Sequence, residues 1–211
     1  MTTALPTQAR RGRPPKITRD DADTRRALLR CGMEVLTEQG LSATGIEQVL
    51  KKLAVPKGSF YHYFKSKEDF GLAVLAEYGR YFERKLQRNL SNTSLTPLER
   101  VGAFVDEAIA GMARHHWQRG CLVGNLGQEI RVLPESFRGQ LEAILNSWQR
   151  LLADCLRDAR AQGQVGTAVD CDVAAAFFWV GWEGAILRAR LVETDQPLKV
   201  FYQGFLASLG R

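Results

Sequence analysis

Apolar residues recur at helical spacing along most of the chain after residue 19. In the first such segment they lie on one side of a helix that ends at Gln39-Gly40: Ala27, Leu28, Cys31, Val35 and Leu36. Alternation of polar and apolar residues, which is typical of a strand, is hard to find over four or more residues. The pattern therefore predicts an all-α fold.

Three further helix starts follow closely. Thr44-Gly45-Ile46-Glu47 is typical of a capping box and opens a short helix that ends near Leu53. Pro56 opens a third helix that reaches Phe64, and Ser66-Lys67-Glu68-Asp69 caps a long fourth one. Two short helices joined by Ala54-Val55, with the first helix behind them, predict a helix-turn-helix.

Later signals predict helices that start at Thr96-Pro97, Pro134, Asp172 and Pro197, which brings the total to about nine. We expect three parts. Residues 1–19 form a flexible basic arm, residues 20–66 form a three-helix DNA-binding module with the helix-turn-helix, and residues 67–211 form a larger helical domain for ligand binding and dimerisation.

Positive charge is concentrated at the front of the chain. Residues 1–67 contain 13 Lys and Arg against 6 Asp and Glu, a balance of +7, whereas the remainder contains 16 against 17, a balance of −1. This distribution is typical of a polyanion-binding module joined to a domain with another task, although a solvated surface would also account for it.

The basic arm contains Arg10-Arg11-Gly12-Arg13-Pro14-Pro15-Lys16, which resembles an AT-hook core. The prolines keep the segment extended, so that Arg11 and Arg13 can enter a narrow minor groove. The alternative is a diffuse attraction of Arg10, Arg11, Arg13 and Lys16 to phosphate.

The third helix divides its side chains between two tasks. Phe60 and Phe64 are four residues apart and should face the interior. The opposite side is left to groups that hydrogen-bond to base edges: Lys57, Ser59, Tyr61, His62 and Tyr63. Gly58 permits close approach to DNA, and Thr44 and Lys67 lie at helix starts where phosphate binds.

The segment Val55 to Phe70, preceded by residues 40–53, resembles the DNA-binding segment of the TetR family of transcriptional regulators. The resemblance implies that the third-helix residues contact an operator and that Thr44 and Lys67 contact phosphate. It also implies a homodimer that responds to a small molecule, most often as a repressor.

The stretch Val173–Leu187 is apolar nearly all round and rich in Gly and Ala, so it should be covered on both sides. One side would meet the core and the other the same helix of a second subunit, with Phe201, Phe205 and Leu209 as a companion face. The alternative is a core helix in a monomer. The stretch is too short to span a bilayer and contains Glu183, so we expect no membrane segment.

Gly120–Glu129 combines three glycines with Cys121, which indicates an adjustable helix beside a cavity. The run Arg119–Leu126, with Gly181–Ala185, is similar to a TetR subgroup that contains the acrylate-utilisation repressor and an electrophile-sensing repressor. The resemblance implies that Cys121 either senses electrophiles or only lines the cavity. The ligand-binding residues that we expect are Trp117, Cys121, Asn125, Glu129, Trp148, Trp179, Trp182 and Glu183, with the two glutamates orienting a ligand or pairing with Arg188 or Arg190.

The remaining residue types narrow the function classes. Cys31, Cys121, Cys155 and Cys171 form no C-x-x-C pair and no signal segment follows Met1, so we expect a cytoplasmic protein without disulfides. We expect no metal, because His115 and His116 point about 100° apart on a helix, and no cofactor. The absence of a phosphate loop or nucleophile elbow disfavours an enzyme. The alternative to an effector-released repressor is an architectural DNA-binding protein without an effector.

Overall fold

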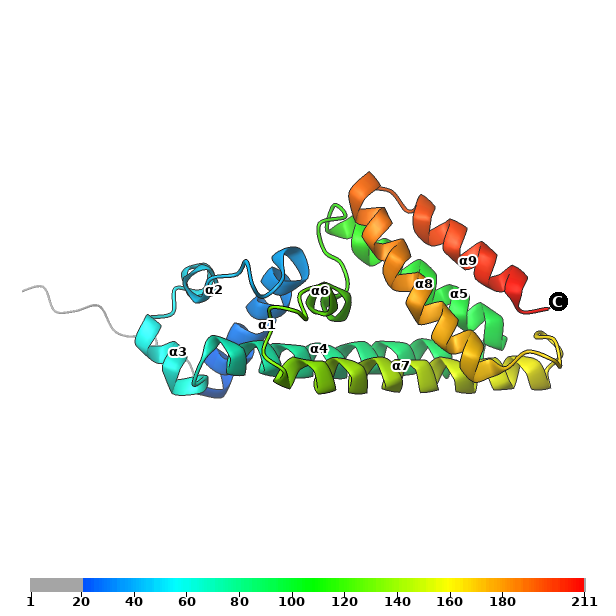
Figure 1. Cartoon of the computed structure of the whole chain (residues 1–211), viewed down its shortest axis with the longest axis horizontal. Coiled ribbons are helices and arrows are strands. Elements are labelled where there is room, and N and C mark those ends of the chain that lie inside the picture. Colours follow the sequence, from blue (N-terminus) through cyan, green and yellow to red (C-terminus); the bar gives the residue numbers. More distant parts are fainter. Residues whose placement is uncertain (1–20, 211) are drawn as a thin grey trace, which may run out of the picture.

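A computed structural model describes residues 21–210, and this part of the chain contains nine α-helices and no strand (Figure 1). The all-α prediction is therefore confirmed. The helices are α1 (Asp21–Gln39), α2 (Ile46–Leu53), α3 (Lys57–Tyr63), α4 (Lys67–Leu90), α5 (Pro97–Arg114), α6 (Leu122–Gln128), α7 (Ser136–Ala161), α8 (Cys171–Val192) and α9 (Gln196–Ser208).

Hydrogen bonds and backbone angles at several helix ends agree with the boundaries that the sequence predicts. The Ser66 hydroxyl accepts from the Asp69 N–H at 3.0 Å at the start of α4. The Glu99 carboxylate accepts from the backbone N–H of Thr96 at 2.8 Å at the start of α5. Gly40 follows α1 with a φ of +79°, in the left-handed region that glycine adopts without strain. Local chemistry thus sets these boundaries.

The capping box predicted at Thr44 is wrong. The N-cap of α2 is Gly45, which has no side chain to cap with, and the hydroxyl of Thr44 donates instead to the carbonyl of Gly40 at 2.6 Å. The loop before α2 turns tightly enough that Thr44 bonds back to the end of α1 rather than forward into α2.

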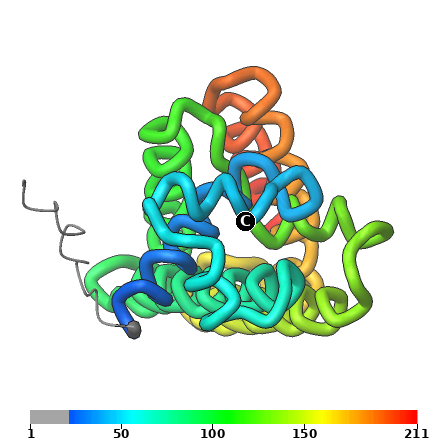
Figure 2. The backbone as a smooth tube through the Cα atoms, turned by 90° about the vertical axis from the view of Figure 1, so that its left-hand side faces the viewer, coloured from blue at the N-terminus to red at the C-terminus, as the bar shows by residue number. Residues whose placement is uncertain are grey.

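The short helices α2 and α3 lie with α1 at one end of the molecule (Figures 1 and 2). The long helices α4 and α7 run side by side and parallel, because Ser136 bonds to Glu68 near their starts and Ser147 bonds to Glu83 further along. At the other end α8 and α9 form an antiparallel pair, in which the ring of Phe201 lies against Gly181. The helices α4–α9, called the body from here on, thus form a bundle that extends from the α1–α3 module.

The core of the body is a cluster of aromatic rings from α4, α5, α7, α8 and α9. Trp148 lies between Phe82 and Trp179, with ring centroids 4.2 and 5.2 Å away. The predicted companion face of the last helix is wrong in part. Phe205 and Leu209 are buried within the protomer and Phe201 packs on the same core, because α9 folds back on α8.

Candidate functional site

Two phenylalanines fix α3 to its own module. Phe60 and Phe64 are 0% and 1% exposed, and their rings lie 5.4 and 5.1 Å from the ring of Phe70 at the start of α4. Arg25 of α1 lies 5.4 Å over the Phe64 ring, a cation–π contact. Because these rings fill the space between α1, α3 and α4, the opposite side of α3 is held outward.

The outward side of α3 carries the polar groups. Tyr61 is 51% exposed, and Lys57 and His62 are exposed as well. The Lys57 ammonium bonds to Glu47 of α2 at 3.0 Å, and this contact raises the Lys57 pKa. A Cβ added to Gly58 would meet no atom within 4 Å, so the backbone there is open to close approach. This face offers donors and acceptors to a ligand on the outside of the module.

Ser59 and Tyr63 are less open than the sequence pattern suggests. Both side chains are half-buried, and Tyr63 packs against the hydrophobic core while its ring lies 5.0 Å from that of His62. A helix of seven residues cannot expose five of them, since its two flanks meet neighbouring elements.

The two predicted phosphate contacts at helix starts differ from each other. Lys67 is half-buried, and its ammonium donates to the carbonyl of Ser42 at 3.3 Å. Thr44 is only 3% exposed, and its hydroxyl hydrogen is used by Gly40. A direct phosphate contact from the Thr44 hydroxyl would require this internal bond to break. The predicted arm residues Arg10, Arg11, Arg13 and Lys16 lie outside the described residues.

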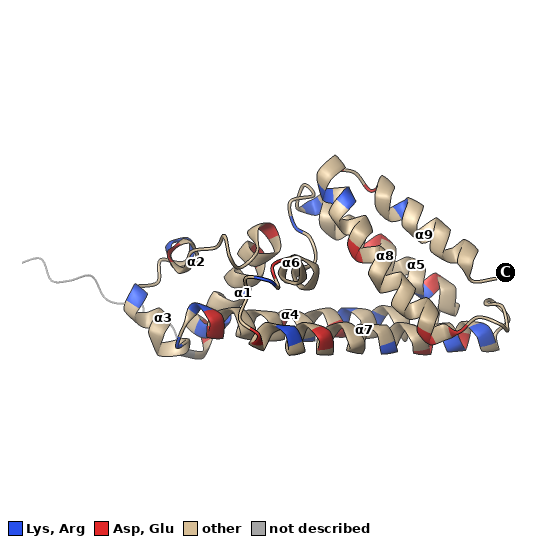
Figure 3. Ribbon diagram, viewed as in Figure 1, with Lys and Arg blue, Asp and Glu red and all other residues tan. Residues whose placement is uncertain are grey.

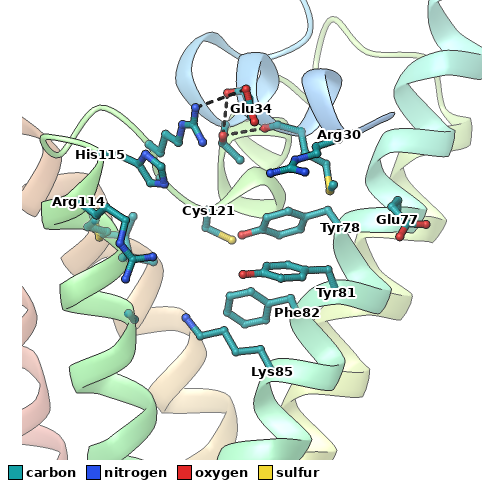
Figure 4. A pocket seen from close by; sticks show the side chains of 18 of the residues that line it. Arg30, Glu34, Glu77, Tyr78, Tyr81, Phe82, Lys85, Arg114, His115 and Cys121 are labelled. Atoms are coloured by element: carbon teal, nitrogen blue, oxygen red, sulfur yellow. Dashed lines mark hydrogen bonds and ion pairs between the residues drawn. The ribbon is translucent and has the colours of Figure 1, made fainter. Parts of the chain in front are cut away.

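A cavity of about 960 Å³ lies between α1, α4, α5 and the segment that precedes α6. Tyr78, Tyr81 and Phe82 of α4 form an aromatic wall, and the thiol of Cys121 faces them (Figure 4). The cavity is large enough for a drug-sized organic molecule, and its mixed aromatic and charged lining is typical of a ligand site.

Only two of the predicted ligand-binding residues, Cys121 and Trp182, line this cavity. Trp148 lines a second, smaller cavity of about 210 Å³ between α4 and α7. Trp179 lies in the aromatic core. Trp117 packs against the core from the loop before α6, where its φ is +60°. Aromatic residues of the body thus serve mainly as core.

Asn125 and Glu129 connect α6 to the α1–α3 module, which corrects their predicted place in a ligand site. The Glu129 carboxylate accepts from the N–H groups of Leu41 and Ser42 at 3.2 and 2.8 Å. The Asn125 amide donates to the carbonyl of Thr37 at 2.9 Å and accepts from Arg190 at 3.1 Å. Arg190 therefore pairs with Asn125 and not with either glutamate. These contacts tie α6 to both ends of the α1–α2 turn region.

Glu183 lies behind Cys121, outside the cavity lining. Its Oε2 fills the space beside Gly124, and its Oε1 is buried with no hydrogen-bond partner among the described residues. Burial raises the pKa of Glu183 to about 7 although the thiol of Cys121 donates a hydrogen bond to it. Burial, together with the charge of Glu183, also holds the pKa of Cys121 well above its usual value, so the resting thiol is neutral.

The sequence reasoning missed most of the cavity wall. Tyr78, Phe82 and Lys85 recur at helical spacing on one side of α4, a pattern that could have indicated a shared face. Arg30 and Arg114 could not have been found in this way, because they come from α1 and α5 and meet only in three dimensions. No cluster of potential metal ligands occurs among residues 21–210, and none of α1–α9 has the length and apolarity to cross a membrane.

Comparison with protein families accounts for both halves of this architecture. Residues 28–74 match the model described as bacterial regulatory proteins, tetR family, and residues 97–205 match the model described as tetracyclin repressor-like, C-terminal domain. The chain belongs to the TetR family. It is therefore a DNA-binding transcriptional regulator, as its relatives are, and it is not an enzyme.

Similarity to individual family members extends over nearly the whole chain. The chain is 48% identical over 202 residues to the transcriptional regulator AcuR of Cereibacter sphaeroides, covering 96% of this chain and 92% of AcuR. It is 31% identical to the repressor DhaR of a Mycobacterium species, covering 84% and 87% of the two chains. Its structure superimposes on a regulatory protein TetR from Rhodobacter sphaeroides with a TM-score of 0.85 at 49% identity, covering 86% and 96%. It superimposes on the reduced form of Escherichia coli NemR with a TM-score of 0.78 at 28% identity, covering 87% and 95%.

Proposed function

We propose that this TetR-family regulator is a homodimeric repressor that binds a palindromic operator through α3 and leaves it when a small organic or electrophilic effector occupies the cavity. In this proposal residues 20–66 bind DNA, residues 67–211 bind effector and dimerise, and the protein acts in the cytoplasm. The observation that carries the proposal is the division of α3 between the buried anchors Phe60 and Phe64 and an outward polar face.

Direct contacts with base edges are assigned to the most open residues of α3. Lys57 and His62 can donate to acceptors in the major groove, and Tyr61 can both donate and contact a thymine methyl group. Ser59, Tyr63 and Lys67 lie closer to the module and suit the phosphates at the groove edge, while Gly58 lets the backbone approach. The arm residues Arg10, Arg11, Arg13 and Lys16 would add a minor-groove contact beside the operator.

The dimer interface is assigned to the outer side of α8 and the neighbouring side of α9. Large aliphatic and aromatic side chains are exposed there in a stripe: Val173, Phe177, Val180, Leu187, Leu191 and Val200. Charged residues are sparse on this pair of helices (Figure 3). An apolar stripe of this kind is typical of a surface covered by a second subunit, and a twofold dimer would place two α3 helices on two half-sites.

An electrophilic effector would act through Cys121. The sulfur would bond to the β-carbon of an activated alkene, the thiol proton would pass to the Glu183 carboxylate, a water in the cavity would protonate the α-carbon, and the resulting hydroxide would be neutralised as Glu183 returns its proton to solvent. The hydrogen bond from the thiol to Glu183 supports this route, because the neutral thiol needs a base nearby. An effector that only fills the cavity would need no reaction at Cys121.

The test is a footprint on the DNA upstream of the gene, with and without N-ethylmaleimide. N-Ethylsuccinimide, which has the same shape but no reactive double bond, is the matched control. We expect wild type to protect a palindrome and to release it with the maleimide only. Tyr61→Ala should lose protection while it remains a dimer, and Cys121→Ser should resist release. An unchanged Tyr61→Ala footprint would contradict the assignment of α3, and release of Cys121→Ser by the maleimide would contradict the thiol reaction.

A further inference from the structure

The cavity is shared between the DNA-binding module and the body. One wall comes from α1, including Leu29, Arg30 and Met33, and the opposite walls come from α4 and α5. The helix α1 also packs behind α2 and carries the module that contains α3. A molecule in this cavity would therefore touch the DNA-binding module itself and not only the body.

The cavity lining contains more positively than negatively charged side chains. Its acidic residues are each already engaged by an arginine: Glu34 by Arg119 at 3.8 Å, Glu77 by Arg80 at 2.6 Å and Glu107 by Arg88 at 2.6 Å. These carboxylates are therefore poorly available to the other cations of the lining.

Three cations remain around the aromatic wall. Neither Arg30 nor Arg114 forms an ion pair with any residue between 21 and 210. The Lys85 side chain is only 12% exposed, its nearest carboxylate is Glu107 at 3.9 Å, and burial lowers its pKa. In Figure 4 the side chains of Lys85 and Arg114 face each other across the cavity beside Phe82, whereas Arg30 lies next to Tyr78 at the other end of the aromatic wall.

We propose that the cavity binds an amphipathic anion whose carboxylate or phosphate group is held by Lys85 and Arg114 and whose apolar part lies on Tyr78, Tyr81 and Phe82 and reaches α1 at Leu29 and Met33. The charges would then be satisfied by charge-assisted hydrogen bonds, and the aromatic wall would be covered. This inference rests on the proposed function, since it takes the bound anion to be the effector.

The α1 wall of the cavity gives the bound molecule a direct route to regulation. A molecule that contacts α1, α4 and α5 together favours the arrangement in which those helices lie at contact distance, and disfavours others. The spacing of the two α3 helices in a dimer depends on that arrangement. The effector would thus shift the module by contact rather than only through the body.

The experiment compares two fluorescent probes of similar shape on the full-length protein: 8-anilinonaphthalene-1-sulfonate, which carries an anion, and N-phenyl-1-naphthylamine, which is neutral. We expect tighter binding of the sulfonate, which higher ionic strength weakens. Each of Lys85→Met and Arg114→Gln should reduce sulfonate affinity by about tenfold or more and leave the neutral probe nearly unchanged. Arg150→Gln, which removes an exposed arginine from α7 away from the cavity, is the matched control and should change neither.

Competition identifies the anion, because hexanoate and hexyl phosphate share an apolar chain and differ in the charged group. Displacement of the sulfonate by either one supports the proposal. The stronger competitor shows whether the cavity prefers a carboxylate or a phosphate. Equal binding of the two probes, or Lys85→Met and Arg114→Gln proteins that both bind the sulfonate as wild type does, would overturn it. If Lys85→Met melts early by circular dichroism, Arg114→Gln decides the outcome. Operator binding is measured on the same samples, so that a failed anion preference with intact operator binding contradicts this inference alone, while wild type without operator binding contradicts the proposed function.

Discussion

The helices α3 and α8 both expose large side chains, but of different kinds. The 7-residue α3 buries Phe60 and exposes Tyr61 beside a lysine and a histidine. The 22-residue α8 buries Trp182 and exposes Val180, which is 78% exposed, in a row of other apolar groups. Hydrogen-bonding groups interleaved with aromatic rings suit a polar, charged partner, whereas a row of aliphatic and aromatic groups suits another protein surface. The difference supports the proposal that DNA and a second subunit bind at opposite ends of one protomer.

The largest effect is expected from a charge on the exposed row of α8. Val180→Glu would place two carboxylates at a twofold interface without partners, and an unpaired buried charge costs several kcal/mol. We expect the dimer to dissociate, as measured by analytical ultracentrifugation, and operator affinity to fall with it.

The control for this prediction is Val132→Glu, at a valine that is 73% exposed in the loop between α6 and α7. It should leave the dimer intact. If Val180→Glu sediments as wild type does, α8 is not part of the dimer interface. The proposed difference between the partners of α3 and α8 would then be wrong.

The buried side of α3 is tested by Phe60→Ala. Removal of this ring leaves a cavity between α1, α3 and α4 and should lower the free energy of unfolding by about 3–5 kcal/mol. The measurement is urea denaturation followed by circular dichroism. Tyr61→Ala, one residue along, should change stability by less than about 0.5 kcal/mol, because its ring is half in solvent. Equal losses in the two variants would mean that α3 has no distinct inner and outer sides.

The buried side of α8 is tested by pH. The pKa of Glu183 is raised from 4.5 to about 7, so the folded protein binds this proton more tightly than the unfolded chain does. Stability from this group is therefore greatest below about pH 4.5 and is lost as pH rises through about 7, by up to roughly 3 kcal/mol. The unfolding free energy of Glu183→Gln should not fall in this way as the pH rises, because its amide does not titrate. The difference in unfolding free energy between wild type and Glu183→Gln, measured from pH 5 to about pH 8, should grow with pH, whereas Glu142→Gln on the exposed side of α7 should show no such trend.

The smallest effect is expected at the contact between Glu129, at the end of α6, and the turn between α1 and α2. Glu129→Gln keeps an acceptor for the N–H groups of Leu41 and Ser42 but removes its charge, which should cost about 1 kcal/mol. Hydrogen exchange should then quicken at the α1–α2 turn. Glu135→Gln, whose exposed carboxylate pairs with Arg138 in the first turn of α7, should not affect that turn between α1 and α2. If exchange at the turn is unchanged in Glu129→Gln, the contact does not couple α6 to the module.

The accuracy of the sequence predictions depended on how far each feature reaches along the chain. The cap at Ser66 and the stop at Gly40 involve residues a few positions apart, and both are present. The two sides of α3 follow from the helical period alone. Even locally the rule failed at Thr44, because the turn after α1 offered its hydroxyl a closer acceptor than the start of α2.

The ligand site shows the opposite case. Glu129 was expected beside a ligand because of its apolar neighbours, yet it caps backbone groups 87 and 88 residues away in sequence. Trp148 and Trp179 were expected there as aromatic residues, and they form the core. A tryptophan in a core and one in a ligand wall have the same sequence neighbourhood, so composition does not separate them.

The sequence by itself determined the helices, the module with its polar recognition face, and the family, because each depends on periodicity and caps within one short segment. Only the tertiary structure decided which side of the uniformly apolar α8 faces outward, that α9 turns its phenylalanines inward, and that Arg30, Lys85 and Arg114 meet around one cavity. Such facts depend on the angles at which distant helices pack, and packing is set by the shapes of many side chains together rather than by any local pattern.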